Sequence, residues 1–175
     1  MMFKVLKTET FYEGKAFTVR KDLVEFPNGN RGNLDIVEHT GAVTLVPVDE
    51  QGQVWFVRQY RHAAGRELLE LPAGTLEKNE EPEACALREV REEIGMAAGN
   101  IELVGEFFLA PGYSTEHMYI FLATRLRDDP LQGDEDEFLN IEKRTIREAI
   151  RMAENGEFLD AKTIAALMLV RNRFG

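Results

Sequence analysis

The stretch at residues 74–96, GTLEKNEEPEACALREVREEIGM, determines how the rest of the chain is interpreted. Because a helix turns by about 100° per residue, Glu89, Glu92 and Glu93 would share one of its faces. Carboxylates gathered on one face repel each other unless cations bind there. The nearly opposite face is apolar and is expected to pack into the core. It comprises Ala84, Leu87, Val90 and Ile94.

The ends of this helix are also marked in the sequence. Pro82 suits the first helical position, and Gly95 suits the left-handed residue just past the last one. Upstream, Leu71-Pro72-Ala73-Gly74 cannot continue a helix and is expected to end a strand and turn into a loop. A site that offers only oxygen ligands favours Mg²⁺ or Mn²⁺ over zinc. The stretch therefore predicts a strand, a loop and an acidic, cation-binding helix.

The spacing of individual residues is more specific than the charge. Gly74 and Glu80 are separated by five residues, and a further seven residues precede Arg88. The pattern then continues with Glu89, Val90, Glu92, Glu93, Gly95 and Met96. It resembles the complete box of the Nudix hydrolases. The alternative is a solvated acidic helix face, the usual explanation of a charge run, but such a face does not require this spacing.

The resemblance implies an α/β protein with a Nudix-like α/β/α sandwich around a mixed β-sheet. Residues 1–175 are expected to form a single domain, because this length suits one core. Within it, residues 1–40 would form an N-terminal antiparallel β segment, and residues 41–175 the Nudix fold. Capping signals at Thr145 and Asp160 predict two further helices near the C-terminus.

The composition limits the partners and the compartment. A net charge of -10 and a pI near 4.9 argue against nucleic acid and membrane partners, which favour a basic surface. Cys85, the single cysteine, is expected to be a small, partly buried residue instead of a nucleophile. No apolar run approaches the roughly 20 residues of a membrane span. We therefore expect a cytoplasmic protein.

The N-terminal residues have the pattern of β-structure, with strands expected at 3–6, 17–26 and 33–38. Between the last two, Pro27-Asn28-Gly29-Asn30 predicts a type I′ hairpin turn, since Asn-Gly accepts positive φ angles. The segment resembles the N-terminal strands with which ADP-ribose-type Nudix enzymes form homodimers and cover part of a neighbour's site. The alternative is an edge sheet of the same subunit.

Two apolar runs, residues 42–48 and 53–58, are separated by a turn signal and are expected to pair as a hairpin of central strands. The second run leads into Arg58 and Arg61. An arginine fork matches two phosphate oxygens, and the resemblance favours Arg61 as a diphosphate contact. Arg58 is a further candidate substrate contact. The alternative for both arginines is a surface ion pair with a glutamate.

Downstream, strands are expected at residues 101–106 and 117–124, on either side of a Pro-Gly turn. By resemblance, a proline 15 residues after the box marks the ADP-ribose pyrophosphatase branch, which also carries a glutamate that contacts the terminal ribose. Pro111 and Glu116 match these two positions. Gly112 and Glu116 are therefore predicted substrate contacts, and the alternative is an ordinary turn between strands.

Residues 127–140 form a polar segment whose acidic run by itself indicates a solvated loop. Related ADP-ribose hydrolases carry an acidic loop in this place that folds over the site. By that resemblance, Glu135 is a candidate general base and Glu137 is a candidate metal ligand.

The resemblance also assigns roles to the residues of the box. Two or three Mg²⁺ ions, replaceable by Mn²⁺, would bind to the Ala73 carbonyl and to the carboxylates of Glu89, Glu93 and Glu137. Glu92 would join them or act as a base, and Arg88 would orient the glutamates.

The expected reaction is hydrolysis of ADP-ribose, a small-molecule nucleoside diphosphate, to AMP and ribose 5-phosphate. One alternative is a broad nucleoside diphosphate sugar hydrolase. An alternative of another class is a non-catalytic, Nudix-like nucleotide-binding module.

Overall fold

The computed structural model describes residues 2–133 and 138–174. Glu135 and Glu137, the two predicted residues of the acidic loop, lie outside this part of the chain. The chain divides into two compact units. The first unit contains the residues up to Gly41 together with Phe107–His117, and the second contains Ala42–Glu106 and the residues from Met118 onward.

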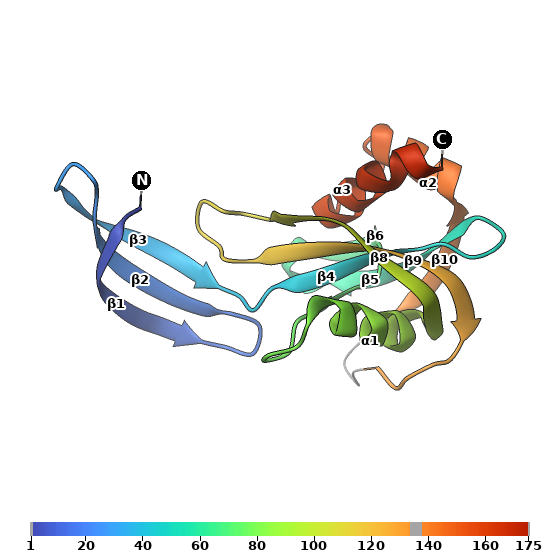
Figure 1. Cartoon of the computed structure of the whole chain (residues 1–175), viewed down its shortest axis with the longest axis horizontal. Coiled ribbons are helices and arrows are strands. Elements are labelled where there is room, and N and C mark those ends of the chain that lie inside the picture. The colour runs from blue at the N-terminus through green and yellow to red at the C-terminus, as the bar shows by residue number, and fades with distance from the viewer. Residues whose placement is uncertain (1, 134–137, 175) are drawn as a thin grey trace. The chain divides into compact units, whose positions relative to one another are not determined.

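The first unit is built on an antiparallel sheet of three strands (Figure 1). They are β1 (Lys4–Glu13), β2 (Thr18–Glu25) and β3 (Arg31–Glu38), in that order across the sheet. The predicted antiparallel β segment is therefore confirmed. β1 is longer than the expected strand at residues 3–6, because threonine and aromatic residues continue its β-forming composition to residue 13.

The turn between β2 and β3 differs from the predicted type I′ turn. That turn requires positive φ at both Asn28 and Gly29, and only Gly29 has it, with φ of 84°. Gly29 N–H donates to the Phe26 carbonyl (2.9 Å), which closes a β-turn with Pro27 in its second position. The proline ring fixes a negative φ there, so the reversal begins one residue before the Asn-Gly pair.

Two sheets form the centre of the second unit (Figure 1). Their strands are β4 (Ala42–Pro47), β5 (Gln53–Arg61), β6 (Arg66–Glu70), β7 (Ala73–Thr75), β8 (Met96–Phe108), β9 (His117–Asp128) and β10 (Asn140–Thr145). One sheet has the order β7-β4-β9-β8, and the other has the order β10-β5-β6. β4 pairs with β9 in parallel and with β7 antiparallel, which confirms the predicted mixed sheet.

The predicted hairpin of residues 42–48 and 53–58 is wrong as a strand pair. Val48 and Val54 form an isolated bridge at the turn, but beyond it β4 and β5 join different sheets. The turn residues reverse the chain without selecting the partner of either strand. β4 is buried at every position, as is typical of a central strand. Its two edges pair with β7 and β9, which are distant in sequence. The strand expected to end near Leu71 is β6, which ends at Glu70. β7 and β10 are not among the predicted strands.

Three helices flank the sheets of the second unit: α1 (Pro82–Ile94), α2 (Ile146–Glu154) and α3 (Ala161–Val170). Short 3₁₀ helices lie at His62–Ala64 and Arg171–Arg173. Figure 1 shows α1 on one face of the sheets and α2 with α3 on the other, which is the predicted three-layer arrangement. Over residues 2–133 and 138–174, no helix has the length and apolar character needed to cross a membrane.

The predicted caps of the last two helices are confirmed. The Thr145 hydroxyl accepts a hydrogen bond from Glu148 N–H (3.2 Å) at the start of α2. The Asp160 carboxylate accepts one from Thr163 N–H (3.0 Å) at the start of α3. Each side chain satisfies a backbone donor that the first helical turn leaves open.

Candidate active site

α1 begins and ends where the sequence predicts. Pro82 occupies the first turn, and Gly95 follows the helix with φ of 71° while its N–H donates to the Val90 carbonyl. The apolar residues of α1 pack into a core cluster with residues of β4 and β9. These residues are Cys85, Ala86, Val90 and Ile94.

The buried face of α1 differs from the predicted one. Ala84 and Leu87 are exposed, whereas Glu89 and Glu93 retain only 7% and 5% of their accessible surface. The buried arc is centred near Ala86 and therefore includes the two glutamates. The helical pattern alone cannot reveal this, because β7 is the element that covers them. The acidic face is thus largely enclosed and is not an ordinary solvated charge run.

β7 approaches these two carboxylates closely. Ala73 N–H donates to Glu93 Oε2 at 3.0 Å. A Cβ atom added at Gly74 would lie 1.8 Å from Glu89 Oε1, so only glycine allows this approach. The structure therefore brings together Ala73, Glu89 and Glu93, which are the predicted metal ligands within the described residues. The other predicted ligand, Glu137, lies outside them.

Arg88 contacts Glu80, Glu89 and Glu92, three glutamates at fixed positions of the box. Its Nη1 donates to Glu89 Oε1 (2.6 Å) and to Glu92 Oε2 (2.8 Å). Its Nε and Nη2 bind the two oxygens of Glu80 at 3.0 and 3.1 Å. The hydrogen bond to Glu80 is the main cause that raises the pKa of Arg88, so the guanidinium is a permanent cation. Arg88 thus binds three carboxylates of the box, and its role in orienting them stays a prediction.

The donor set fits a hard divalent cation. It consists of carboxylate oxygens and the backbone of β7, which are ligand types that suit Mg²⁺. Within residues 2–133 and 138–174, no three acidic, histidine or cysteine side chains converge as a preformed metal cluster. Glu89 and Glu93 instead accept hydrogen bonds from Arg88 and Ala73. A bound cation would share these carboxylates with their present donors.

Cys85 lies beside this constellation, with its Sγ 3.4 Å from Arg88 Nη2. Its side chain is fully buried, and its Sγ lies 3.7 Å from the Thr75 carbonyl. Burial raises the pKa of the Cys85 thiol, so the reactive thiolate is disfavoured. This agrees with the prediction of a small buried residue.

The two predicted arginines are both in ion pairs. Arg61 binds Glu70 through a bidentate fork, with Nε and Nη2 each 2.8 Å from a carboxylate oxygen. The hydrogen bond that Arg61 donates to Glu70 is the main cause that raises the pKa of Arg61, and the charge of Glu93 adds to it. Arg58 pairs with Glu142 on β10. Arg61 is therefore influenced by the charge of Glu93 on α1.

Glu70 was not identified from the sequence, although it is 1% exposed. The sequence does indicate that Glu70 is buried, because it interrupts the apolar run Leu68-Leu69-Glu70-Leu71. A charge inside such a run is expected to be paired, but its partner depends on how β5 and β6 align. Arg61 and Arg66 are Cα partners across those strands, and the side chain of Arg61 reaches Glu70.

Gly112 and Glu116 belong to the first unit. Glu116 N–H donates to Ser114 Oγ (3.1 Å), and the Glu116 carbonyl accepts from Leu109 N–H (3.2 Å). A Cβ atom at Gly112 would have no neighbour within 4 Å. The turn therefore has open space around Gly112, and the substrate contacts assigned to Gly112 and Glu116 stay predictions.

Comparison with known proteins identifies relatives of the whole chain. The family model described as NUDIX domain matches residues 38–167. An ADP-ribose pyrophosphatase of Bacillus subtilis (strain 168) is 36% identical over 170 residues, which cover 96% of this chain and 92% of the relative. A methanol dehydrogenase activator of Bacillus methanolicus is 33% identical, with the same coverage. A crystal structure of an ADP compounds hydrolase has 28% identity and a TM-score of 0.86, covering 99% of this chain and 94% of that one. These matches confirm the predicted fold class and family.

Proposed function

Since the chain belongs to the Nudix hydrolase family, we propose that it hydrolyses the diphosphate bond of ADP-ribose to AMP and ribose 5-phosphate. The observation that carries the proposal is the enclosed pair Glu89 and Glu93, which β7 covers through Ala73 N–H and the close approach of Gly74. Buried carboxylates of this kind need a cation beside them. The name of the Bacillus subtilis relative supports ADP-ribose as the substrate.

Nudix hydrolases generally use a divalent cation, and we propose Mg²⁺ here, with Mn²⁺ as a substitute. The ligands would be the Ala73 carbonyl, Glu89, Glu93 and Glu137. When bound, the metal neutralises phosphate charge and polarises the attacking water, and this supplies most of the rate in diphosphate hydrolysis. Arg88 would keep Glu89 and Glu92 in place while this occurs.

The remaining roles are those that the family resemblance implies. Arg61 and Arg58 would meet the diphosphate oxygens, and Gly112 and Glu116 the sugar end of the substrate. Arg61 supports this best, because its side chain is 42% exposed while two of its nitrogens are fixed on Glu70. Glu92 or Glu135 would accept the proton of the attacking water.

A second candidate is a module that binds a nucleotide without hydrolysing it. It is favoured only by the name of the Bacillus methanolicus relative, a methanol dehydrogenase activator. Binding alone does not require Glu89, Glu92 and Glu93 together on one helix beside Arg88. A broad nucleoside diphosphate sugar hydrolase would use the same chemistry with a less selective pocket.

The substrate is tested with a panel of ADP-ribose, ADP-glucose, GDP-mannose, FAD and NADH. We expect ADP-ribose to have the highest kcat/KM with Mg²⁺, with AMP identified as a product by chromatography. EDTA should abolish turnover, and added Mn²⁺ should restore it, because the carboxylate donors accept either ion. Equal rates with several sugars would indicate the broad hydrolase, and no turnover of any compound would indicate the binding module.

We also propose a cytoplasmic homodimer that forms through the N-terminal strands. β1 is exposed along its length, and several apolar side chains of the first unit are largely exposed. They are Phe3 (46%), Val5 (54%), Phe11 (58%), Tyr12 (55%) and Phe17 (42%). Exposed apolar side chains in this number on one small sheet are typical of a contact surface. The cytoplasm suits a chain whose single cysteine, Cys85, is a buried free thiol.

The dimer is tested by sedimentation equilibrium. The wild type should sediment as a dimer, and Phe11→Glu should shift it to a monomer, because the variant places a charge at an apolar position of the proposed interface. Tyr60→Glu is the matched control, since Tyr60 is equally exposed (59%) but lies on β5 in the second unit. A monomeric wild type, or a dimeric Phe11→Glu variant, would contradict the proposal.

A further inference from the structure

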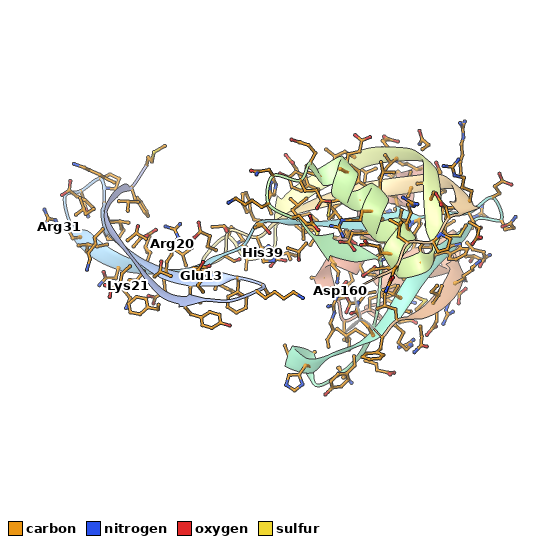
Figure 2. The ribbon with its side chains drawn as sticks, turned by 90° about the horizontal axis from the view of Figure 1, so that it is seen from below. Glu13, Arg20, Lys21, Arg31, His39 and Asp160 are labelled. Atoms are coloured by element: carbon orange, nitrogen blue, oxygen red, sulfur yellow. The ribbon has the colours of Figure 1, made fainter. Side chains whose placement is uncertain are left out.

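A second charged cluster lies at the N-terminus of α3, next to Arg61. Its centre is Glu70, the last residue of β6, which is 1% exposed. Glu70 Oε2 accepts hydrogen bonds from Arg61 Nη2 (2.8 Å) and from Lys162 Nζ. Lys162 also pairs with Asp160 at 2.9 Å, and Asp160 (labelled in Figure 2) caps α3. The cluster therefore combines two cations and two carboxylates from three different elements.

Glu70 is ionised in this cluster. Burial acts to raise its pKa, but the hydrogen bonds and positive charges of Arg61 and Lys162 outweigh burial and hold the pKa below its usual value. A buried carboxylate is strongly held by partners of this kind, because losing one of them leaves a charge without full compensation. The side chain of Lys162 is itself only 11% exposed, so water cannot readily replace its ammonium group.

The backbone that follows Glu70 connects this cluster to the carboxylates of α1. Leu71 N–H donates to Thr163 Oγ1 on α3 (2.9 Å). The Pro72 carbonyl accepts two hydrogen bonds from β4, at 2.9 and 3.0 Å. Ala73 N–H then donates to Glu93 on α1 (3.0 Å). Three consecutive residues are thus fixed to three elements, and the first turn of α3 supports one end of the site.

We propose that Lys162 is a positioning residue, which holds Glu70 so that the guanidinium of Arg61 is presented to the diphosphate of the substrate. Arg61 uses Nε and Nη2 to bind Glu70, and its Nη1 makes no hydrogen bond within the described part of the chain. Glu70 is bound by Lys162 of α3 as well as by Arg61 of β5. The hydrogen bond from Lys162 prevents the Glu70 carboxylate from turning together with the Arg61 side chain. Arg61 consequently offers Nη1 in one fixed orientation. The inference rests on the proposed function, since it assumes a diphosphate ligand.

The first test is the variant Lys162→Met, which keeps the apolar stem and removes the ammonium group. KM for ADP-ribose should rise about tenfold, the effect of one weakened charge-assisted hydrogen bond, and kcat should change less. Arg61→Lys should have a similar effect, and combining the two should add little, because both act through the same guanidinium. Lys162→Arg should recover most of the loss, since it restores a cation beside Glu70.

The matched control is Lys143→Met. Lys143 also pairs with a carboxylate in the second unit, Asp49 at 3.8 Å, but it lies outside the cluster. Its kinetics should equal those of the wild type. If Lys162→Met does not fold, Lys162→Gln provides the same comparison with a neutral donor. Wild-type KM in the folded variant, or fully additive effects of Lys162→Met and Arg61→Lys, would overturn the proposal.

Binding of ADP after removal of divalent cations with EDTA separates this inference from the proposed function. Calorimetry should show weaker ADP binding by Lys162→Met and Arg61→Lys than by the wild type, and no further loss in the double variant. This cycle needs no turnover, so it tests Lys162 even if no compound of the substrate panel is hydrolysed. Equal ADP binding by the wild type and both single variants would overturn the inference.

Discussion

Replacing Glu93 by glutamine is expected to lower turnover at saturating Mg²⁺ and ADP-ribose by about 100-fold or more. The Glu93 side chain is nearly buried, and its Oε2 accepts the Ala73 N–H at 3.0 Å. Glutamine keeps the shape and can still accept this hydrogen bond. It removes the negative charge that would hold a divalent cation, so the loss should fall on the chemistry and not on the fold.

Steady-state kinetics across a Mg²⁺ titration measure this loss, and thermal unfolding shows whether the fold is intact. Glu83→Gln is the matched control, because Glu83 lies in the first turn of the same helix and is exposed. It should retain wild-type kinetics. A loss smaller than about tenfold for Glu93→Gln would contradict a role as metal ligand, because such roles normally contribute about 100-fold.

The parts of the site that could be predicted from the sequence are local. The limits of α1 follow from Pro82 and Gly95, whose backbone preferences act within one turn of the helix. The contact of Arg88 with Glu92 joins residues four apart on one helix, so the spacing alone places them together. Backbone preference and helical spacing act over a few residues. The sequence therefore predicts the limits of α1 correctly.

The contacts that were missed depend on strand pairing. Glu70 contacts Arg61 because β5 and β6 pair as antiparallel strands. It also contacts Lys162 of α3, which is 92 residues away in the sequence. A turn signal could not show that β4 and β5 would separate into two sheets. For the same reason, the exposure of Leu87 and the burial of Glu89 could not be read from α1 alone. In each case the contact is made by an element other than the one that carries the residue.

Gly74 shows how such an element controls the carboxylates, and its replacement by alanine is expected to lower turnover by about 100-fold. The new Cβ would lie 1.8 Å from Glu89 Oε1 and 1.9 Å from Glu89 Cδ, far inside van der Waals contact. Either the Glu89 carboxylate must leave its position beside Arg88, or β7 must move away from α1. Both changes displace a proposed metal ligand, and a small misplacement of such a group can cost about 100-fold. Overpacking should also destabilise the fold by about 1–3 kcal/mol.

Gly105→Ala separates the effect on the site from overpacking alone. The new Cβ at Gly105 would also be too close to a neighbour, at 2.9 Å from Leu169 Cδ1, but that atom ends a side chain that is 45% exposed and can turn away. Gly105→Ala should therefore keep wild-type turnover. For Gly74→Ala, the Mg²⁺ concentration required for half-maximal rate should rise as turnover falls, because Glu89 is displaced. Wild-type values for both quantities would mean that the position of Glu89 against β7 is not required for activity.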